Sequence, residues 1–85
     1  MGRRKRTVPA KLGNKLLAIR NSLGLTGEQL IEKLNCPSIP LQKAHISRYE
    51  NGLAEPPLIV VLQYAKLAKV HMEAIVDDST DLTLK

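Results

Sequence analysis

The apolar residues in the first third of the chain recur at the spacing of a helix. One face is marked at steps of four, three and four residues by Leu12, Leu16, Ile19 and Leu23. Pro9 offers a start for this helix, and Gly24 offers a C-terminal stop. The pattern predicts a first helix over residues 10–23.

The residues after Gly24 carry the pattern of an N-terminal helix cap, which predicts a second helix. Thr26 and Gln29 have the spacing of a capping box, in which a hydroxyl and a side-chain amide satisfy free backbone N–H groups. The apolar face that follows consists of Leu30, Ile31 and Leu34. We expect a helix over residues 26–34, too short to be stable without packing.

Prolines interrupt the chain after this helix. Pro37 and Pro40 fit a turn, or a turn that leads into the first turn of a helix, where a missing N–H is tolerated. A third helix is predicted from Pro40 or Leu41 to Asn51, and Gly52 ends it. Its inward face comprises Leu41, Ile46 and Tyr49.

Two further helices are expected before the end of the chain. Pro57 stands near the first position of a fourth helix. The apolar face of this helix comprises Leu58, Val61, Leu62, Ala65, Leu67 and Ala68. Residues 71–76 are predicted to form a short fifth helix, and the residues after Asp77 are expected to be a mobile tail.

Composition narrows the class of fold. Eighty-five residues suffice for one small domain. The chain has no Phe and no Trp, so the core must be built from Leu, Ile, Val and Ala, which suits helices packed on helices. The single Cys36 excludes an intramolecular disulfide and is expected to be a small apolar filler. We therefore predict an all-α domain.

Charge is unevenly distributed along the chain. The net charge is +5, and residues 1–20 hold seven basic residues and no acidic one. Residues 1–9 are interpreted as a flexible basic arm, residues 10–77 as the folded domain, and residues 78–85 as an acidic flexible tail. A basic segment at one end favours a polyanionic partner there, with nucleic acid preferred over simple solubility.

Several segments, in order, resemble the lambda-repressor-like (phage repressor/Cro, xenobiotic-response-element type) family of helix-turn-helix DNA-binding domains. The matching segments are residues 19–26, residues 29–34, residues 46–52 followed by Pro56, and residues 74–78. The resemblance covers about residues 10–77. It implies five helices, with the helix-turn-helix at the second and third.

The resemblance also implies which side chains reach DNA bases from the third helix. These residues are Gln42, Lys43, Ala44, Ser47 and Arg48. Gln42 can bond adenine through two hydrogen bonds, and Lys43 or Arg48 can bond the acceptors of guanine. Ala44 can touch only a thymine methyl group. Without a partner, the same residues would be an ordinary exposed polar face.

Phosphate contacts would hold the protein in register on DNA. In the folded domain they are expected at Thr26, Gly27, Gln29, Ser38 and Asn51. In the arm they are expected at Arg3, Arg4, Lys5 and Arg6, which would follow the backbone or enter a minor groove. Gly27 departs from the family, which usually has Gln there. The resemblance further implies a structural ion pair between Arg20 and Glu50.

The spacing of the two helices also departs from the family. Between Leu34 and Ile46 the chain has about five residues more than usual for the tight turn of a helix-turn-helix. The extra residues lengthen either the turn or the third helix. With a displaced third helix, Ser38 and Gln42 would contact phosphate and not bases.

The function expected from these features is sequence-specific binding of double-stranded DNA by a transcriptional regulator, a repressor, acting in the cytoplasm on the nucleoid. A homodimer on DNA is expected. Its candidate contact is formed by Met72, Ile75 and Val76 of the fifth helix, which would otherwise close the core. The alternative function is a protein-interaction module of the same fold, such as an antitoxin that binds a toxin.

Other classes of function find little support. His45, His71 and Cys36 have no metal-like spacing, and no phosphate-binding glycine loop occurs, so we expect no enzyme, metal or cofactor. No apolar run approaches the roughly 20 residues of a membrane span. The basic arm lacks the apolar face or lipid signal that membrane-surface binding needs. No small-molecule ligand is implied.

Overall fold

The computed structural model describes residues 11–34 and 36–82, which form five helices and no strand. The helices are α1 (Leu12–Leu23), α2 (Gly27–Lys33), α3 (Lys43–Glu50), α4 (Leu58–Ala68) and α5 (Met72–Val76). The all-α fold with five helices predicted from the sequence is thus confirmed. The basic arm expected over residues 1–9 lies outside the described residues.

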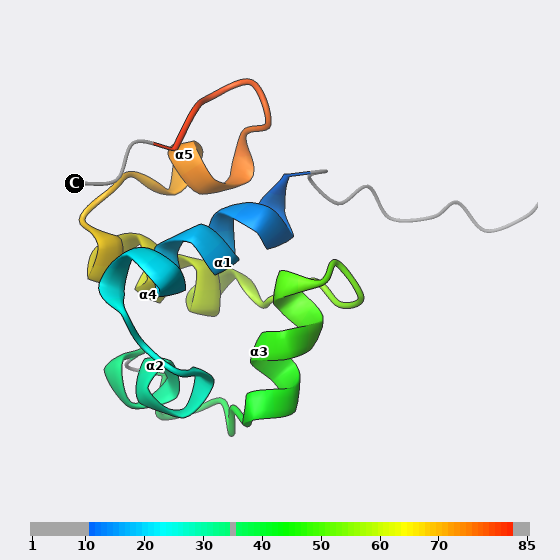
Figure 1. Ribbon diagram of the computed structural model, residues 1–85, viewed down its shortest axis with the longest axis vertical. Coiled ribbons are helices and arrows are strands. Elements are labelled where there is room, and N and C mark those ends of the chain that lie inside the picture. Colours follow the sequence, from blue (N-terminus) through cyan, green and yellow to red (C-terminus); the bar gives the residue numbers. More distant parts are fainter. Residues whose placement is uncertain (1–10, 35, 83–85) are drawn as a thin grey trace, which may run out of the picture.

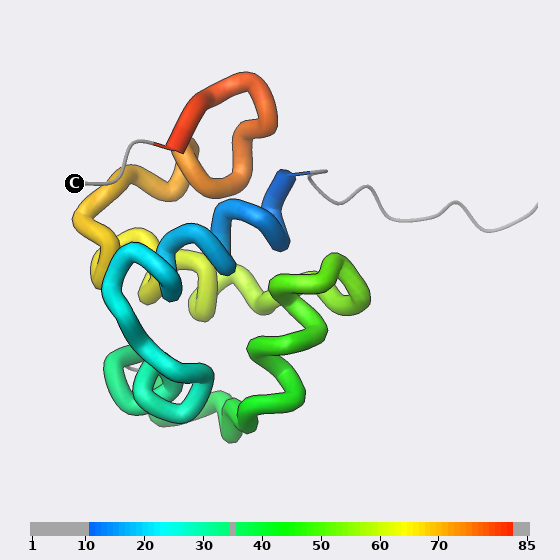
Figure 2. Tube along the Cα trace, in the orientation of Figure 1, coloured from blue at the N-terminus to red at the C-terminus, as the bar shows by residue number. Residues whose placement is uncertain are grey.

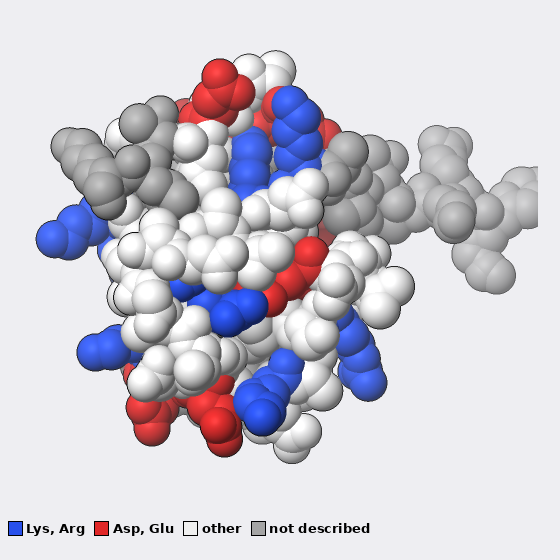
Figure 3. Space-filling view, in the orientation of Figure 1, with Lys and Arg blue, Asp and Glu red and all other residues white. Residues whose placement is uncertain are grey.

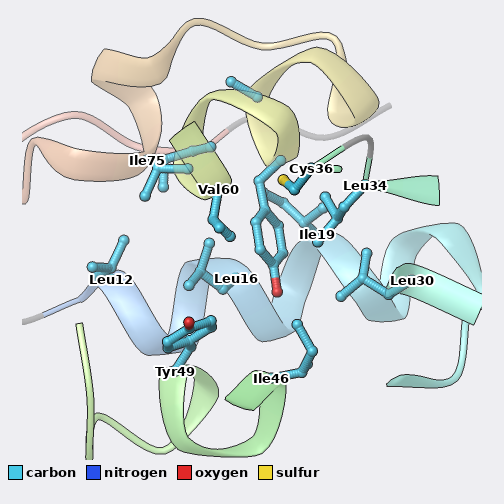
Figure 4. Packing of buried hydrophobic residues seen from close by; sticks show 13 residues of the cluster. Leu12, Leu16, Ile19, Leu30, Leu34, Cys36, Ile46, Tyr49, Val60 and Ile75 are labelled. Carbon is cyan, nitrogen blue, oxygen red and sulfur yellow. The ribbon is translucent and has the colours of Figure 1, made fainter. Parts of the chain in front are cut away.

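α1 is the central helix of the domain. It contacts α3, α4 and α5, while α2 packs against α3. Figure 1 shows α1 crossing the middle of the molecule, with α5 on one side and α2 and α3 on the other. In Figure 4 the α1 side chains Leu12, Leu16 and Ile19 lie between α3 and the α4–α5 pair. Helix α3 is therefore mounted on the central helix, and α2 is held mainly through α3.

Two helix ends predicted from local signals, the end of α1 and the start of α2, are found in the structure. Gly24 ends α1 in the left-handed conformation, with φ +67°. At the start of α2, the Gln29 N–H donates to Thr26 Oγ1 at 3.2 Å, and the Thr26 N–H donates to Gln29 Oε1 at 2.9 Å. This capping box fixes where α2 begins next to α1.

The start of α3 differs from the prediction. The helix begins at Lys43, not at Pro40 or Leu41, so the extra residues lengthen the turn. The connection is held on the domain because Cys36 is buried and Ile39 packs against the core. A proline also disfavours the helical conformation in the residue before it, which keeps Ile39 out of a helix. The long connection runs beneath α2 to the first turn of α3 in Figure 2.

Residues 77–82 also differ from the expected mobile tail. They fold back onto the domain, because the ammonium group of the buried Lys15 donates to the carbonyl oxygens of Ala74, Asp77 and Thr80 at 2.7–2.8 Å. Figure 2 shows this last segment, in orange and red, turning back over α5. Hydrogen bonds from the side chain and the backbone N–H of Ser79, and one from the hydroxyl of Thr80, lower the pKa of the Asp77 carboxyl. The turn is therefore stabilised above the ordinary Asp pKa, and this contribution is lost as the pH falls through the lowered one.

α1 and α3 approach closely at Gly13. A Cβ atom at this position would lie 2.8 Å from the carbonyl oxygen of Glu50 and 2.9 Å from that of Tyr49. Such distances are too short for any side chain, and the neighbouring atoms are backbone. Gly13 thus lets the last turn of α3 rest directly on α1.

Candidate nucleic-acid interface

One face of α3 is open to solvent and carries most of the predicted base contacts. Lys43, Ala44, Ser47 and Arg48 are exposed, while Ile46 and Tyr49 on the opposite face are 2% and 6% exposed. Helical spacing explains the division, because residues three and four apart share a face. The core thus holds α3 by one side and presents the other.

Gln42 occupies a different position from the other candidates. It is the exposed N-cap of α3 and has extended backbone dihedrals, so it precedes the helical face. Its N–H donates to Nδ1 of His45 at 2.9 Å. The structure therefore places Gln42 at the tip of the helix, ahead of the row formed by Lys43 and Ser47.

The start of α2 lies beside the start of α3. A side chain at Gly27 would begin 3.7 Å from Cγ of Lys43, so the stem of Lys43 runs past the space that Gly27 leaves open. A shallow hollow at this junction is lined by Arg20, Gly27, Lys43, Ile46, Ser47 and Glu50. The structure thus brings a predicted phosphate contact, Gly27, together with two predicted base contacts.

Three other predicted phosphate contacts have intramolecular partners. Thr26 and Gln29 bond each other in the capping box. Asn51, at the end of α3, donates from Nδ2 to the carbonyl oxygen of Ser47 at 2.8 Å and to its hydroxyl oxygen at 3.3 Å. Asn51 is therefore coupled to a predicted base contact one turn earlier.

The remaining predicted phosphate contacts form two groups. Ser38 is exposed on the connection between α2 and α3. The four basic residues of the arm, Arg3, Arg4, Lys5 and Arg6, lie outside the described residues. Figure 3 shows basic side chains among uncharged ones over α3, and acidic as well as basic side chains in the region of α2.

A forked ion pair fixes α3 behind this surface. Nε of Arg20 donates to Oε2 of Glu50 at 2.7 Å, and Nη2 donates to Oε1 at 3.0 Å. Nη1 also donates to the carbonyl oxygen of Leu25 at 3.1 Å. The hydrogen bond to Glu50 raises the pKa of Arg20, against the opposing effect of burial. Arg20 therefore joins α1, the α1–α2 connection and α3 through one charged group.

Two supporting residues were not anticipated from the sequence. His45 accepts the hydrogen bond at the start of α3, and Lys15 holds the segment after α5. A signal for each exists in the sequence. His45 follows Gln42 at the three-residue spacing that Gln29 has to Thr26, and Lys15 stands between the inward-facing Leu12 and Leu16.

The arrangement defines a class of protein. A short helix and a connection lead to a second helix whose outer face is polar, and both helices rest on a scaffold of three others. This is the arrangement of a helix-turn-helix domain, a class of domains whose second motif helix commonly lies in the major groove of DNA.

Comparison with known proteins agrees with this class. A helix-turn-helix family model matches residues 16–75. The chain belongs to this family, the lambda-repressor-like helix-turn-helix domains, which are DNA-binding transcription regulators. A search of the curated proteins found no match to the chain.

The described part of the chain contains neither a membrane-spanning helix nor a candidate metal site. Across residues 11–34 and 36–82, no helix is long and apolar enough to cross a membrane. The same residues contain no group of three His, Cys, Asp or Glu side chains placed to hold a metal ion.

Proposed function

We propose that the chain is a transcriptional repressor that binds a specific double-stranded DNA sequence with α3 in the major groove. The exposed face of α3, opposite a face fixed in the core, is the observation that carries the proposal. Arg48 and Lys43 suit the acceptors of guanine, and Gln42 suits adenine. Bound at a promoter, such a domain would repress by occupying the site. Its place in the cell would be the cytoplasm, in association with the nucleoid.

One phosphate contact in this proposal lies at the α2–α3 junction. The backbone at Gly27 borders the same hollow as Lys43, so a phosphate bound at the start of α2 would lie beside the α3 residues proposed to read the bases. Ser38 and Asn51 stand beyond the two ends of α3, and the basic residues of the arm would add further contacts. These contacts position the domain without reading the sequence.

Replacement of Arg48 tests the assignment of α3. Sequences selected from a random duplex pool provide the specific site, and fluorescence anisotropy measures the affinity. We expect Arg48→Ala to weaken binding to the selected site by about five- to a hundredfold and to relax the preference at one base pair. Affinity for random DNA should change much less.

Lys66→Ala is the matched control, because it removes one positive charge from an exposed position on α4. It should leave the selected site bound nearly as tightly as before. Equal losses on selected and random DNA for Arg48→Ala would show that α3 does not read the bases. Absence of binding at any salt concentration would reject the DNA proposal and favour the protein-interaction module. For a DNA binder, affinity should fall with salt at a log–log slope near −0.9 for each phosphate contacted.

We further propose that two copies bind DNA together as a homodimer. An apolar hollow between the start of α1, the start of α4 and α5 is lined mainly by Leu12, Pro56, Pro57, Leu58, Val61, Met72 and Val76. Leu58 is 73% exposed, contrary to its predicted place in the buried face of α4. Ile75 is fully buried, so it belongs to the core and not to the candidate contact.

The composition of this hollow favours a second copy of the chain as its partner. A two-fold interface brings the same surface together with itself, so a surface rich in like charges would repel its mate. Glu55 is the charged residue in the lining, and the rest is apolar. The surface begins in the loop that follows α3, so a dimer formed there would hold both α3 helices in fixed positions on two half-sites.

Leu58→Ser tests the dimer without disturbing the core. Because Leu58 is largely exposed, the variant should fold with nearly wild-type stability. We expect its self-association, measured by sedimentation equilibrium, to weaken by about tenfold or more, as for loss of a central apolar contact. Leu23→Ser, at an exposed leucine outside the hollow, is the control. Equal association of both variants and wild type would reject this surface.

A further inference from the structure

The side chain of Asn51 holds a serine on the outer face of α3. Its amide nitrogen, Nδ2, lies 2.8 Å from the carbonyl oxygen of Ser47 and 3.3 Å from the Ser47 hydroxyl oxygen, and it donates to both. Both residues are exposed, and Ser47 also borders the hollow shared by α2 and α3. A residue at the end of the helix thus acts on a side chain in the proposed reading face.

The bond to the backbone fixes which way the Asn51 amide faces. A carbonyl oxygen only accepts hydrogen bonds, so the amide must turn its NH₂ group, and not its oxygen, toward Ser47. Because an amide NH₂ group only donates, the Ser47 hydroxyl oxygen must be the acceptor in the second bond. The backbone N–H of Asn51 donates to the same carbonyl oxygen at 3.0 Å, which keeps residue 51 close to Ser47.

The second bond determines what the Ser47 hydroxyl does on its open side. A hydroxyl has one proton and two lone pairs, and a lone pair that accepts from Asn51 turns the proton away from that amide. Ser22, near the end of α1, uses its proton within its own helix, because its hydroxyl donates to the carbonyl oxygen of Ile19 at 2.9 Å. Within the described residues the Ser47 hydroxyl accepts from Asn51 and donates to no other group, so its proton is available to a ligand.

Bases in the major groove differ in what they offer to a hydroxyl donor. Guanine presents N7 and O6, thymine presents O4 and adenine presents N7 as acceptors, whereas cytosine presents only its N4 amino group, a donor. A serine whose hydroxyl rotates freely can donate or accept, so it distinguishes these bases poorly. A serine held as a donor disfavours cytosine, because two donors would then face each other.

We propose that Asn51 is a positioning residue that makes Ser47 a hydrogen-bond donor and thereby sets α3 against cytosine at the base that Ser47 meets. This role of Asn51 rests on the proposed function, and it gives the reading face one specific preference. It differs from a phosphate contact by Asn51 in what it changes. A phosphate contact alters the affinity for every sequence alike, whereas a positioning residue alters the order of preference at one base pair.

The experiment measures binding to duplexes that carry the selected site and differ at one base pair. That pair is the one at which Ser47→Ala changes the order of preference. Wild type, Ser47→Ala, Asn51→Ala and the double variant are compared by fluorescence anisotropy. Asn21→Ala is the matched control, because it removes an exposed asparagine amide from the last turn of α1. All of the replaced residues are exposed, so the variants should fold.

We expect wild type to bind the duplex with cytosine at this position about three- to tenfold less tightly than the best of the others, as for one hydrogen bond. Asn51→Ala should lose most of this discrimination, and the double variant should show the same preference as Ser47→Ala. Asn21→Ala should keep the wild-type order. An equal loss for Asn51→Ala on every duplex would overturn the proposal and leave Asn51 as a phosphate contact. A Ser47→Ala variant that changes the preference at no base pair would overturn it as well.

The orientation of the Ser47 hydroxyl is tested without DNA by NMR. The side-chain NH₂ signals of Asn51 should shift in Ser47→Ala, because the bond to the hydroxyl oxygen is lost while the bond to the carbonyl oxygen remains. Those of Asn21 should not shift. Unchanged Asn51 signals would overturn the orientation. If the Asn51 signals shift but wild type binds no duplex, then the bond between Asn51 and Ser47 stands, while the proposed function and the base preference that rests on it both fail.

Discussion

Arg20→Met should lower the free energy of unfolding by about 3 kcal/mol, because it leaves the largely buried carboxylate of Glu50 without its partner. The side chain of Glu50 is 8% exposed, whereas that of Arg20 is 24% exposed. Glu50→Met should therefore cost less, about 2 kcal/mol, because the remaining guanidinium can still reach water and the carbonyl oxygen of Leu25. The two single variants are compared by urea unfolding.

The double variant separates the ion pair from the packing of its two stems. With both charges removed, no unpaired group remains, so the double variant should lose clearly less stability than the sum of the single variants, with a coupling of at least about 1 kcal/mol. Arg48→Met is the matched control, since it removes an exposed charge from α3 and should change stability by less than about 0.5 kcal/mol. Strictly additive losses would show that Arg20 and Glu50 act independently.

The ion pair also bears on recognition, because Arg20 and Glu50 line the same hollow as Gly27 and Lys43. Under conditions in which Arg20→Met remains folded, its affinity for the selected site should still fall. Arg48→Met should lose affinity with no loss of stability. The two variants thus distinguish a residue that positions α3 from one that touches DNA.

Helix boundaries set by local chemistry could be predicted from the sequence. The left-handed Gly24 and the capping box of Thr26 and Gln29 each depend on residues within one turn of each other. The inward face of α3 was predictable for a similar reason, since the spacing of Ile46 and Tyr49 permits one buried side. The exposed row of the candidate site follows from this division.

Features that depend on contacts distant in sequence could not be predicted. Pro40 is compatible with a turn and with the start of a helix, and the choice is made by the burial of Cys36, the packing of Ile39 and the bond to His45. The hydrogen bond between Asn51 and Ser47 could not be predicted either, because it depends on where α3 ends. The polar composition of residues 77–82 is typical of a mobile segment. Nothing in the local sequence indicates that carbonyl groups of this region bind Lys15 on α1.

Lys15→Met is expected to release that segment. The ammonium group of Lys15 donates hydrogen bonds to three carbonyl oxygens, those of Ala74, Asp77 and Thr80. Lys15 as a residue is only 7% exposed. Methionine retains most of the packing of the stem but donates nothing. Hydrogen bonds to a charged group are worth about 1.5–3 kcal/mol each and are not additive, so we expect a total loss of about 2–4 kcal/mol. Urea unfolding measures this loss.

Lys11→Met is the control for the loss of a nearby positive charge. Lys11 is exposed, and it is its backbone N–H that donates to Asp78, so the change of side chain leaves that bond in place. Its stability should change by less than about 0.5 kcal/mol. Similar small losses in both variants would show that the three carbonyl bonds contribute little to holding residues 74–82.

The location of the damage in Lys15→Met distinguishes a local from a global effect. Hydrogen exchange should accelerate most in α5 and residues 77–82, because these lose their attachment to α1, while α2 and α3 remain protected. Met72 and Val76 of α5 line the proposed dimer surface. Self-association should therefore weaken together with the protection of α5, while binding of a single copy to one half-site should be nearly unchanged. If Lys15→Met instead lost protection in α3 first, the ammonium would be supporting the recognition helix and not the dimer surface.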